Sequence, residues 1–267
     1  MIDLEKTVLK VIDSAVEAGR FIEGERKNFD FGKIEYKGKN DLVSYVDKKA
    51  EFLLLDSLTK ILPDSGFIAE EGTGTRNTNG MNWVVDPLDG TTNFMHGFPS
   101  YSVSIGLLEN HEIILGVIYD ISKGNCYWAT KNGKSYCDGN EIKTSDVRNF
   151  EDGLYITGYP YRDFSKYRNF YELMYHFLTN THGVRRIGSA AIDLAYVASG
   201  KSEGFFEFSL NPWDVAAGSL IVTQAGGVVS DFKGTDNYLF GKEFIAGNPF
   251  VHSKMQQVIQ EYWDKKY

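Results

Sequence analysis

Two aspartates that flank a proline and a leucine, Asp86 and Asp89, have the residue type and spacing best suited to metal chemistry. Pro87 fixes the backbone between them, and Gly90 lets the chain pass close to a bound group. Hard cations such as Mg²⁺ prefer oxygen ligands, which two carboxylates and the carbonyl of Leu88 can supply. The same pair is also typical of a tight turn whose aspartates cap a helix, so the spacing alone leaves both interpretations open.

The residues that follow this pair suit an anion beside the metal. Residues 90–93 read Gly-Thr-Thr-Asn and can open a helical turn whose first N–H groups have no intrahelical acceptor. Such N–H groups bind phosphate oxygens, so a phosphate site would adjoin the metal site.

Two further acids are expected at the ends of secondary-structure elements. Glu70 and Asp86 each follow a short predicted strand, so both carboxylates would lie at the carboxyl ends of strands. Asp214 precedes a helix predicted over 215–225, where an N-cap is the alternative interpretation. Four acids could therefore meet in one place.

The elements that must position these acids alternate along the chain and are expected to pack in layers. Alternating apolar residues over 101–143 predict an antiparallel meander with a turn at Asn132 and Gly133. We expect one catalytic domain over 1–267, with lobes 1–146 and 147–267 and the metal site between them. The other expected elements are helices at 4–22, 47–62, 164–178, 190–198, 215–225 and 250–265, and strands at 42–46, 67–69, 83–85, 154–157, 184–187, 204–208, 228–230 and 244–246.

Composition excludes several classes of protein. The chain of 267 residues has 28 Lys and Arg against 36 Asp and Glu, a net charge of −8, so it lacks the basic field that gathers nucleic acid or anionic lipid. It contains no apolar run near the roughly 20 residues of a membrane span and no signal-peptide pattern, so we expect a cytoplasmic protein. Cys126 and Cys137 are expected to be unpaired, because a two-residue turn would set Trp128 opposite Cys137.

Three motifs resemble one known family. Residues 83–94, Trp-Val-Val-Asp-Pro-Leu-Asp-Gly-Thr-Thr-Asn-Phe, are similar to the first signature of the inositol monophosphatase family. Residues 213–218 with 225–227 resemble its second signature, and residues 69–72 resemble its acidic motif. The order and separation of the motifs agree as well, so the resemblance covers nearly the whole chain.

The resemblance implies a fold, a metal centre and an assembly. The fold would be of the α+β class, a layered α-β-α-β-α sandwich, and the protein would be a lithium-sensitive homodimer. One Mg²⁺ would be held by Glu70, Asp86 and the Leu88 carbonyl, and a second by Asp86, Asp89 and Asp214. Family members are often described with a third, weaker Mg²⁺ position, which would lie near Glu70 here. The resemblance therefore implies two or three Mg²⁺ per site.

The resemblance also assigns catalytic and substrate-binding roles. Glu70 together with Thr91, whose hydroxyl Asp47 would orient, would take a proton from the attacking water. The substrate-binding residues would be the N–H groups of Gly90, Thr91 and Thr92 for the phosphate, and Ser189, Ala190 and Glu207 for the rest of the molecule. Read without the family, Glu207 is an outward residue on an alternating strand and Ser189 is a helix cap. Asp193 follows the same motif but is left out of the predicted site.

The expected reaction is hydrolysis of a small phosphate monoester, inositol 1-phosphate in the first place, by in-line attack of a metal-activated water. Residues 158–162 are bulkier and more aromatic than we expect of an inositol-selective member. Fructose 1,6-bisphosphate, NADP and adenosine 3′,5′-bisphosphate therefore stay as alternatives. Arg162 or Lys166 could bind a second phosphate, although basic residues in a polar loop are more often solvated. Arg185 and Arg186 are interpreted as a surface pair.

A regulatory binding protein on the same fold is the other class that survives, because a fold does not determine a function. A decayed site would be expected to have lost ligands. The predicted set is complete in this chain, with Glu70, Asp86, Asp89, Thr91 and Asp214 all present. Completeness favours catalysis.

Overall fold

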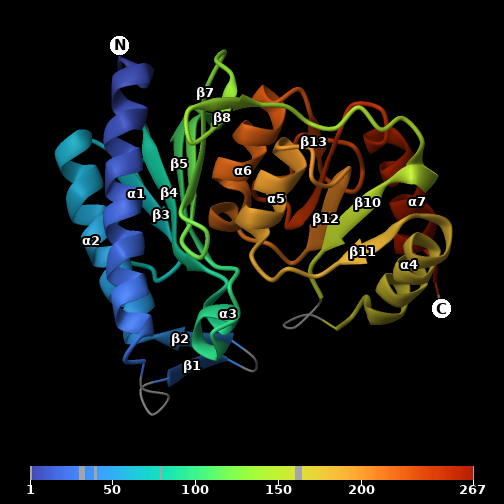
Figure 1. The fold of residues 1–267 in the computed structure, drawn as a ribbon, viewed down its shortest axis with the longest axis horizontal. Helices are drawn as coiled ribbons and strands as arrows, with labels where there is room; N and C mark the ends of the chain where they lie inside the picture. Colours follow the sequence, from blue (N-terminus) through green and yellow to red (C-terminus); the bar gives the residue numbers. More distant parts are fainter. Residues whose placement is uncertain (1, 30–33, 39–40, 79, 160–163, 267) are drawn as a thin grey trace.

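Two long helices form the outer layer at the N-terminal side of the molecule (Figure 1). The computed structural model describes residues 2–29, 34–38, 41–78, 80–159 and 164–266. Helix α1 spans Leu4–Arg26 and α2 spans Tyr45–Ile61. The carboxylate of Asp3 caps α1 by accepting a hydrogen bond from the Lys6 N–H. The buried stripe of α1 recurs every three or four residues, which turns one face of the helix toward the sheet behind it.

The first sheet has seven strands in the order β3-β4-β5-β6-β7-β8-β9. Strands β3 and β4 are parallel, and every later pair is antiparallel, as the predicted meander requires. The strands are β3 (Gly66–Ala69), β4 (Asn82–Asp89), β5 (Ser102–Glu109), β6 (Glu112–Asp120), β7 (Asn125–Thr130), β8 (Ser135–Cys137) and β9 (Asn140–Ile142).

The second sheet has five strands in the order β11-β10-β12-β14-β13. It is mixed, because β10 is parallel to both of its neighbours whereas β14 is antiparallel to both of its own. The strands are β10 (Leu154–Thr157), β11 (Gly183–Arg185), β12 (Gly204–Phe208), β13 (Val228–Ser230) and β14 (Glu243–Gly247).

Helices α5 (Ala190–Ala198) and α6 (Pro212–Gln224) lie between the two sheets, and α4 (Tyr167–Asn180) and α7 (His252–Trp263) cover the far face of the second (Figure 1). One apolar cluster joins residues of both sheets, such as Val84 and Phe205, to the buried helix α6. A helix that is apolar on all sides belongs in the middle of a layered fold. The molecule is therefore an α-β-α-β-α sandwich, and the predicted fold class is confirmed.

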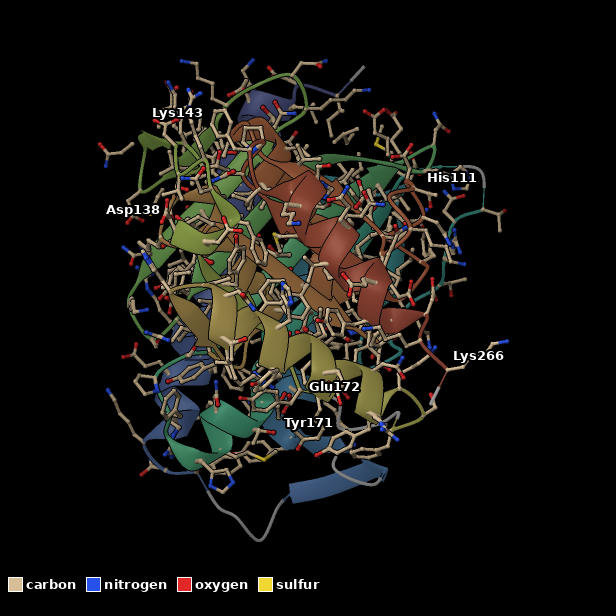
Figure 2. The ribbon with its side chains drawn as sticks, turned by 90° about the vertical axis from the view of Figure 1, so that its right-hand side faces the viewer. His111, Asp138, Lys143, Tyr171, Glu172 and Lys266 are labelled. Atoms are coloured by element: carbon tan, nitrogen blue, oxygen red, sulfur yellow. The ribbon has the colours of Figure 1, made fainter. Side chains whose placement is uncertain are left out.

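Figure 2 looks onto the outermost layer, in which α4 and α7 pack side by side. Their buried faces form a third apolar cluster with the second sheet. The opposite face of α4 carries exposed side chains, including Tyr171 and Glu172. The remaining short elements are β1 (Ile34–Gly38), β2 (Asp41–Ser44), α3 (Thr91–His96) and a 3₁₀ turn at Phe150–Asp152.

Two predicted details differ from the structure. Strand β4 does not end before Asp86 but continues to Asp89, and α6 begins at Pro212 instead of Val215. The hairpin register is also shifted by one residue, because five residues separate the paired Ala129 and Ser135, so Cys137 lies opposite Tyr127 and not Trp128. The prediction of two free cysteines is confirmed. In the part of the chain that the structure describes, no helix has the length and apolar character to cross a membrane.

Among the described residues, the chain passes from the seven-stranded sheet to the five-stranded sheet once, in the connection from β9 to β10. The predicted boundary near residue 146 falls in this connection. Helix α6 nevertheless packs on β5 and β6 of the first sheet, so the two halves share a core. A division into two lobes stays a prediction.

Candidate active site

The end of strand β4 faces the middle layer because side chains alternate along a strand. Trp83 and Val85 pack in the cluster beneath α1 and α2, whereas Val84 packs in the cluster around α6. Asp86 continues the alternation of Val84 and is 2% exposed. Its carboxylate is thus buried on the side of the sheet that α5 and α6 cover.

A β-bulge brings Asp89 to the same region. Two residues three positions apart would ordinarily point to opposite faces of a strand. Between Asp86, paired with Ser104, and Asp89, paired with Ser102, β4 contains one residue more than β5. The extra residue reverses the alternation, and Pro87 suits this place because it has no N–H to lose from the ladder. The Leu88 N–H donates to Asp86 Oδ1 at 3.0 Å and closes the turn.

Glu70 reaches the same edge from the neighbouring strand. Strands β3 and β4 are parallel, with Ala69 paired with Val85, so Glu70 and Asp86 are the next residues on adjacent strands. The Glu70 N–H donates to the Val85 carbonyl at 3.2 Å, which keeps the two chains together at this point. The predicted convergence of carboxylates at the ends of two strands is present.

Thr91 and Asp47 form a hydrogen-bonded pair beside these acids. Asp47 lies in the first turn of α2 and is 1% exposed. The Thr91 hydroxyl lies 2.8 Å from Asp47 Oδ1 and 3.0 Å from the carbonyl oxygen of Leu88. A carboxylate is the stronger acceptor of the two, so the single hydroxyl hydrogen favours Asp47, which is not part of the cavity lining, and the oxygen lone pairs are left to accept a hydrogen bond.

The start of α3 supplies the predicted backbone donors. Gly90 is the N-cap with φ 92°, and a methyl group there would lie 2.9 Å from the Ser100 carbonyl oxygen and 3.1 Å from that of Gly188. Only glycine fits both the left-handed conformation and the close approach. The N–H groups of Thr91 and Thr92 follow in the first turn, before any intrahelical acceptor.

Helix α6 contributes Asp214 to the site. Asn211 is the N-cap of this helix, so Asp214 is its third helical residue and not the N-cap. One carboxylate oxygen of Asp214 accepts the Asn211 N–H at 2.6 Å, which is half of a capping box. The sequence interpretation of Asp214 as a simple N-cap was therefore wrong, although the residue does contribute to the cap.

Asp89 ties the site to α5. Its Oδ2 accepts the Ser189 hydroxyl at 2.6 Å and the Ala191 N–H at 2.7 Å. Ser189 also caps α5 by accepting the Ile192 N–H, as predicted from the sequence. Ser189 is buried behind Asp89, whereas Ala190 lies at the surface of the cavity.

A cavity of about 460 Å³ opens over these groups. Ten of the predicted residues line it in the described part of the chain: Glu70, Asp86, Leu88, Asp89, Gly90, Thr91, Thr92, Ala190, Glu207 and Asp214. Asp47 and Ser189 stand behind this lining. The lining residues that were not predicted as site residues are Asn93, Phe98, Tyr159, Arg186, Ile187, Gly188 and Leu210.

Burial raises the pKa values of two acids of the cavity, Asp86 and Asp89. Burial, followed by the charges of Glu70, Asp89 and Asp214, raises the pKa of Asp86 well above its usual value. Burial also raises the pKa of Asp89, although its hydrogen bonds from Ser189 and Ala191 oppose the shift. A divalent cation among these carboxylates would replace the protons and offset the repulsion.

The donors fit Mg²⁺ by their chemistry. They are carboxylates and one carbonyl, with no thiolate or imidazole among the predicted ligands, as a hard cation requires. In the positions that the described side chains adopt, no group of three or more His, Cys, Asp or Glu residues could hold an ion as it stands. Asp86, Asp89 and Asp214 each engage a backbone N–H, so metal binding would require them to turn toward a common point.

Glu207 does not face outward. It is 7% exposed on β12, lines the cavity, and burial raises its pKa to about 7. The outward interpretation failed because β12 is a central strand with helices on both faces of its sheet. Asp193, one turn into α5, is buried nearby, and its two carboxylate oxygens have no hydrogen-bond partner among the described residues. Burial, followed by the charge of Glu207, raises the pKa of Asp193 well above its usual value.

The basic residues differ from the prediction. The ammonium group of Lys166 donates to the Trp263 carbonyl oxygen at 3.0 Å and does not line the cavity, and Arg162 lies outside the described residues. Arg186, interpreted as a surface residue in a salt bridge, is exposed as predicted but forms no ion pair among the described residues, and it lines the cavity. The available signal was its position directly before the motif that contains Gly188 and Ala190.

Comparison with known proteins agrees with this geometry. The family model described as "Inositol monophosphatase family" matches residues 3–266. Nus factor SuhB of Escherichia coli K12 is 37% identical over 245 residues, which are 91% of this chain and 92% of that protein. An inositol-1-monophosphatase of Mesorhizobium japonicum is 35% identical over 255 residues, 94% of this chain and 95% of the relative.

Solved structures with the same fold include a SuhB protein and an IMPase. The extragenic suppressor protein SuhB of Bartonella henselae superposes with a TM-score of 0.88 at 35% identity and covers 94% of this chain and 97% of its own. The IMPase of Thermotoga maritima has a TM-score of 0.85 at 32% identity, with 94% and 95% covered.

Proposed function

The chain belongs to the inositol monophosphatase family, and we propose that it is a Mg²⁺-dependent phosphatase of small phosphate monoesters, with inositol 1-phosphate as the first candidate substrate. One observation carries the proposal: four acids from different elements, Glu70, Asp86, Asp89 and Asp214, line one cavity beside the start of α3. Turns and helix caps account for Asp86, Asp89 and Asp214 separately, because each accepts a hydrogen bond from a backbone N–H. They do not explain why all four are gathered where burial and mutual repulsion oppose it.

In this proposal the ligands of two or three Mg²⁺ are the carboxylates of Glu70, Asp86, Asp89 and Asp214 and the Leu88 carbonyl. The metal would lower the pKa of a water molecule and offset the charge of the leaving oxygen. The charges of Glu70, Asp89 and Asp214 each act on Asp86 and raise its pKa, so all three acids are within electrostatic reach of it. This supports Asp86 as the acid that would contribute to both ions.

The protein's own groups would handle the proton of the attacking water. The Thr91 hydroxyl, whose hydrogen is directed to Asp47, can accept a hydrogen bond from the water and so orient it. The Glu70 carboxylate, at the same edge of the cavity, is the group that would receive the proton. Asp47 is a positioning residue, because it acts through Thr91 and lies behind the cavity wall.

The N–H groups of Gly90, Thr91 and Thr92 would hold the phosphate oxygens. They are fixed before the substrate arrives, because Gly90 is wedged between two backbone segments. Donors held in advance stabilise developing charge without a reorganisation cost. Beyond the phosphate, Glu207 and the backbone around Ser189 and Ala190 would contact the hydroxyl groups of the substrate.

A regulatory binding role is the second candidate, since several relatives near 37% identity are named Nus factor SuhB. The complete set of cavity acids supports catalysis as a function of this chain even if a binding role exists beside it.

A homodimer, the other family expectation, would have apolar surface to bury on α4, where Tyr171, Tyr175 and Leu178 are all more than half exposed. Sedimentation analysis of the purified chain tests the dimer, and a pull-down from lysate with the Asp86→Asn variant tests a binding role independent of catalysis.

Phosphate release tests the proposed function directly. The panel contains inositol 1-phosphate, fructose 1,6-bisphosphate, NADP and adenosine 3′,5′-bisphosphate, each with Mg²⁺ and with EDTA in its place. We expect Mg²⁺-dependent release from at least inositol 1-phosphate. Release from the other three alone would exclude inositol 1-phosphate as a substrate, and release from none would contradict the phosphatase proposal.

A further inference from the structure

Arg186 is the single basic side chain in the cavity lining that the structure describes. It follows β11 and precedes the N-terminus of α5. Its guanidinium group lies against Gly188, where an added methyl group would come within 2.9 Å of the Arg186 Nη1. The positive φ of 98° at Gly188 gives a second reason for glycine there. The backbone thus leaves space for the guanidinium to enter the cavity wall.

An aromatic ring of the cavity lining backs this guanidinium. The Arg186 Cζ lies 6.0 Å from the centroid of the Tyr159 ring, at the limit of a cation–π contact. Tyr159 in turn packs edge-on against Phe170 of α4, with 6.2 Å between the ring centroids. The ring restricts the position of the guanidinium group. A cation–π contact uses none of the N–H donors of that group, so they remain available for hydrogen bonds.

The donors of Arg186 are not used by the described part of the protein, in which the guanidinium makes neither a hydrogen bond nor an ion pair. Its charge does reach three buried carboxyls, because it lowers the pKa values of Asp89, Asp193 and Glu207 against the effect of burial. No oxygen of these carboxyls lies within ion-pair distance of it. An exposed, unpaired guanidinium in a cavity for phosphate esters has its planar fork free for an anion.

We propose that Arg186 determines specificity by binding a second phosphate of the substrate, one that is not hydrolysed. This inference rests on the proposed function and narrows its substrate class: the protein hydrolyses simple monoesters but binds esters with a second phosphate more tightly. The fork geometry of arginine matches phosphate oxygens in pairs, which selects phosphate over a neutral hydroxyl. The sequence suggested Arg162 or Lys166 as the ligand of a second phosphate, and this proposal gives that role to Arg186.

Two other roles for Arg186 make different predictions. If it held the phosphate that is hydrolysed, or if it only compensated the charge of Asp89, Asp193 and Glu207, its loss would affect every substrate alike. A second-phosphate role affects only substrates that carry that phosphate. The ratio of kinetic constants within a matched pair of substrates separates these cases.

The experiment measures kcat and KM for two matched pairs, inositol 1-phosphate with inositol 1,4-bisphosphate and fructose 1-phosphate with fructose 1,6-bisphosphate. The variants are Arg186→Gln and Arg186→Lys. The control is Arg185→Gln, which removes the same charge one residue away: Arg185 donates to the Val184 carbonyl oxygen at 3.2 Å and does not line the cavity.

In at least one pair, we expect the wild-type protein to have the lower KM for the bisphosphate. Arg186→Gln should raise that KM roughly 10- to 100-fold, the range for a hydrogen bond between charged groups. The constants for the monophosphate should stay within about threefold, Arg186→Lys should be intermediate because it keeps charge without the fork, and Arg185→Gln should match the wild type.

Equal losses on both members of a pair, or no wild-type preference for either bisphosphate, would overturn the assignment of Arg186 while leaving the phosphatase proposal intact. No phosphate release from any of these four esters, nor from NADP or adenosine 3′,5′-bisphosphate, would overturn the phosphatase proposal, and the Arg186 assignment with it. The two failures are therefore distinguishable in one data set.

Discussion

Asp86 and Glu207 show how differently two buried acids can be read from a sequence. Asp86 stands in a motif whose residue types and spacing allow either an oxygen-ligand site or a capped turn, and the other acids together with the family resemblance favoured the metal site. Glu207 stands on a strand whose alternation predicts an outward side chain, and only the family resemblance pointed to the cavity. Single-sequence alternation could not reveal the cavity because β12 is covered on both faces. Arg186 was interpreted as a surface residue and Asp193 was left out of the predicted site, because burial and cavity contacts depend on the packing of α5, which local sequence does not specify.

The contact between Gly158 and Glu207 gives a prediction at this scale. A methyl group at position 158 would lie 1.8 Å from Glu207 Oε1, so Gly158→Ala must displace that carboxylate. We expect KM for inositol 1-phosphate to rise about tenfold, the value of one hydrogen bond to a charged group. Steady-state kinetics with inositol 1-phosphate and with p-nitrophenyl phosphate, which lacks the ring hydroxyls, make the measurement.

The aryl ester serves as the internal control, because its hydrolysis needs no hydroxyl contact and should change by less than about threefold. An unchanged KM for inositol 1-phosphate would mean that Glu207 does not contact the substrate. Equal losses on both esters would indicate general damage to the cavity.

At the scale of elements, much of the fold could be predicted from periodicity. The structure reproduces the predicted strands at 154–157, 204–208 and 228–230 and the helix at 190–198. The boundaries of β4 and α6 were missed at the site itself. A bulge carries β4 past Pro87, and Pro212 starts α6 one turn earlier, where proline at the first helical position is favoured. The bulge positions the carboxylate of Asp89, and the early helix start positions that of Asp214. Neither feature produces a regular hydrophobic period, so periodicity could not predict it.

The contact of α6 with the first sheet is tested at Gly116. An added methyl group there would lie 2.7 Å from the Ala217 carbonyl oxygen and 3.0 Å from its Cα, so Gly116→Ala pushes on the backbone of the helix that carries Asp214. Overpacking of this kind costs about 1–3 kcal/mol of unfolding free energy. We expect a melting temperature lowered by roughly 2–4 °C per kcal/mol, measured by calorimetry.

Gly24→Ala is the matched control, since Gly24 lies in α1 and an added methyl group would meet nothing within 4 Å. Replacing glycine by alanine inside a helix stabilises by up to about 1 kcal/mol. If both variants melted alike, close packing of α6 on β6 would not be what holds Asp214 in place.

At the scale of the whole molecule, the sequence predicted the layers but not how they share a core. The middle helices come from the C-terminal half and pack on the N-terminal sheet, so one cavity receives Glu70 and Asp86 from one half and Asp214 and Glu207 from the other. Charge composition indicated only an acidic protein. The concentration of that charge in one buried cavity required the fold.

This concentration of buried acid predicts how stability depends on pH and Mg²⁺. The raised pKa values of Asp86 and Glu207 mean that the folded protein binds more protons than the unfolded chain. The free energy of unfolding should therefore fall as the pH rises from about 4 through the folded pKa, near 7 for Glu207. Mg²⁺ needs ionised ligands, so its stabilising effect should grow over the same range.

Thermal melting with and without Mg²⁺ at about pH 5 and about pH 8 makes the measurement. At 100 times its Kd the ion adds about 2.7 kcal/mol, roughly 5–10 °C, and we expect this shift at the higher pH and a smaller one at the lower. A shift of equal size at both values would contradict ion binding by carboxylates with raised pKa values.

The most direct test of the central claim is phosphate release from inositol 1-phosphate by the Asp86→Asn variant at saturating Mg²⁺. The control is Asp56→Asn, which removes the same charge from an exposed ion pair with Lys60 on α2. Loss of the proposed metal ligand should lower kcat/KM by about a thousandfold, roughly 4 kcal/mol of transition-state stabilisation, whereas the control should match the wild type. Near wild-type turnover by Asp86→Asn would contradict the account.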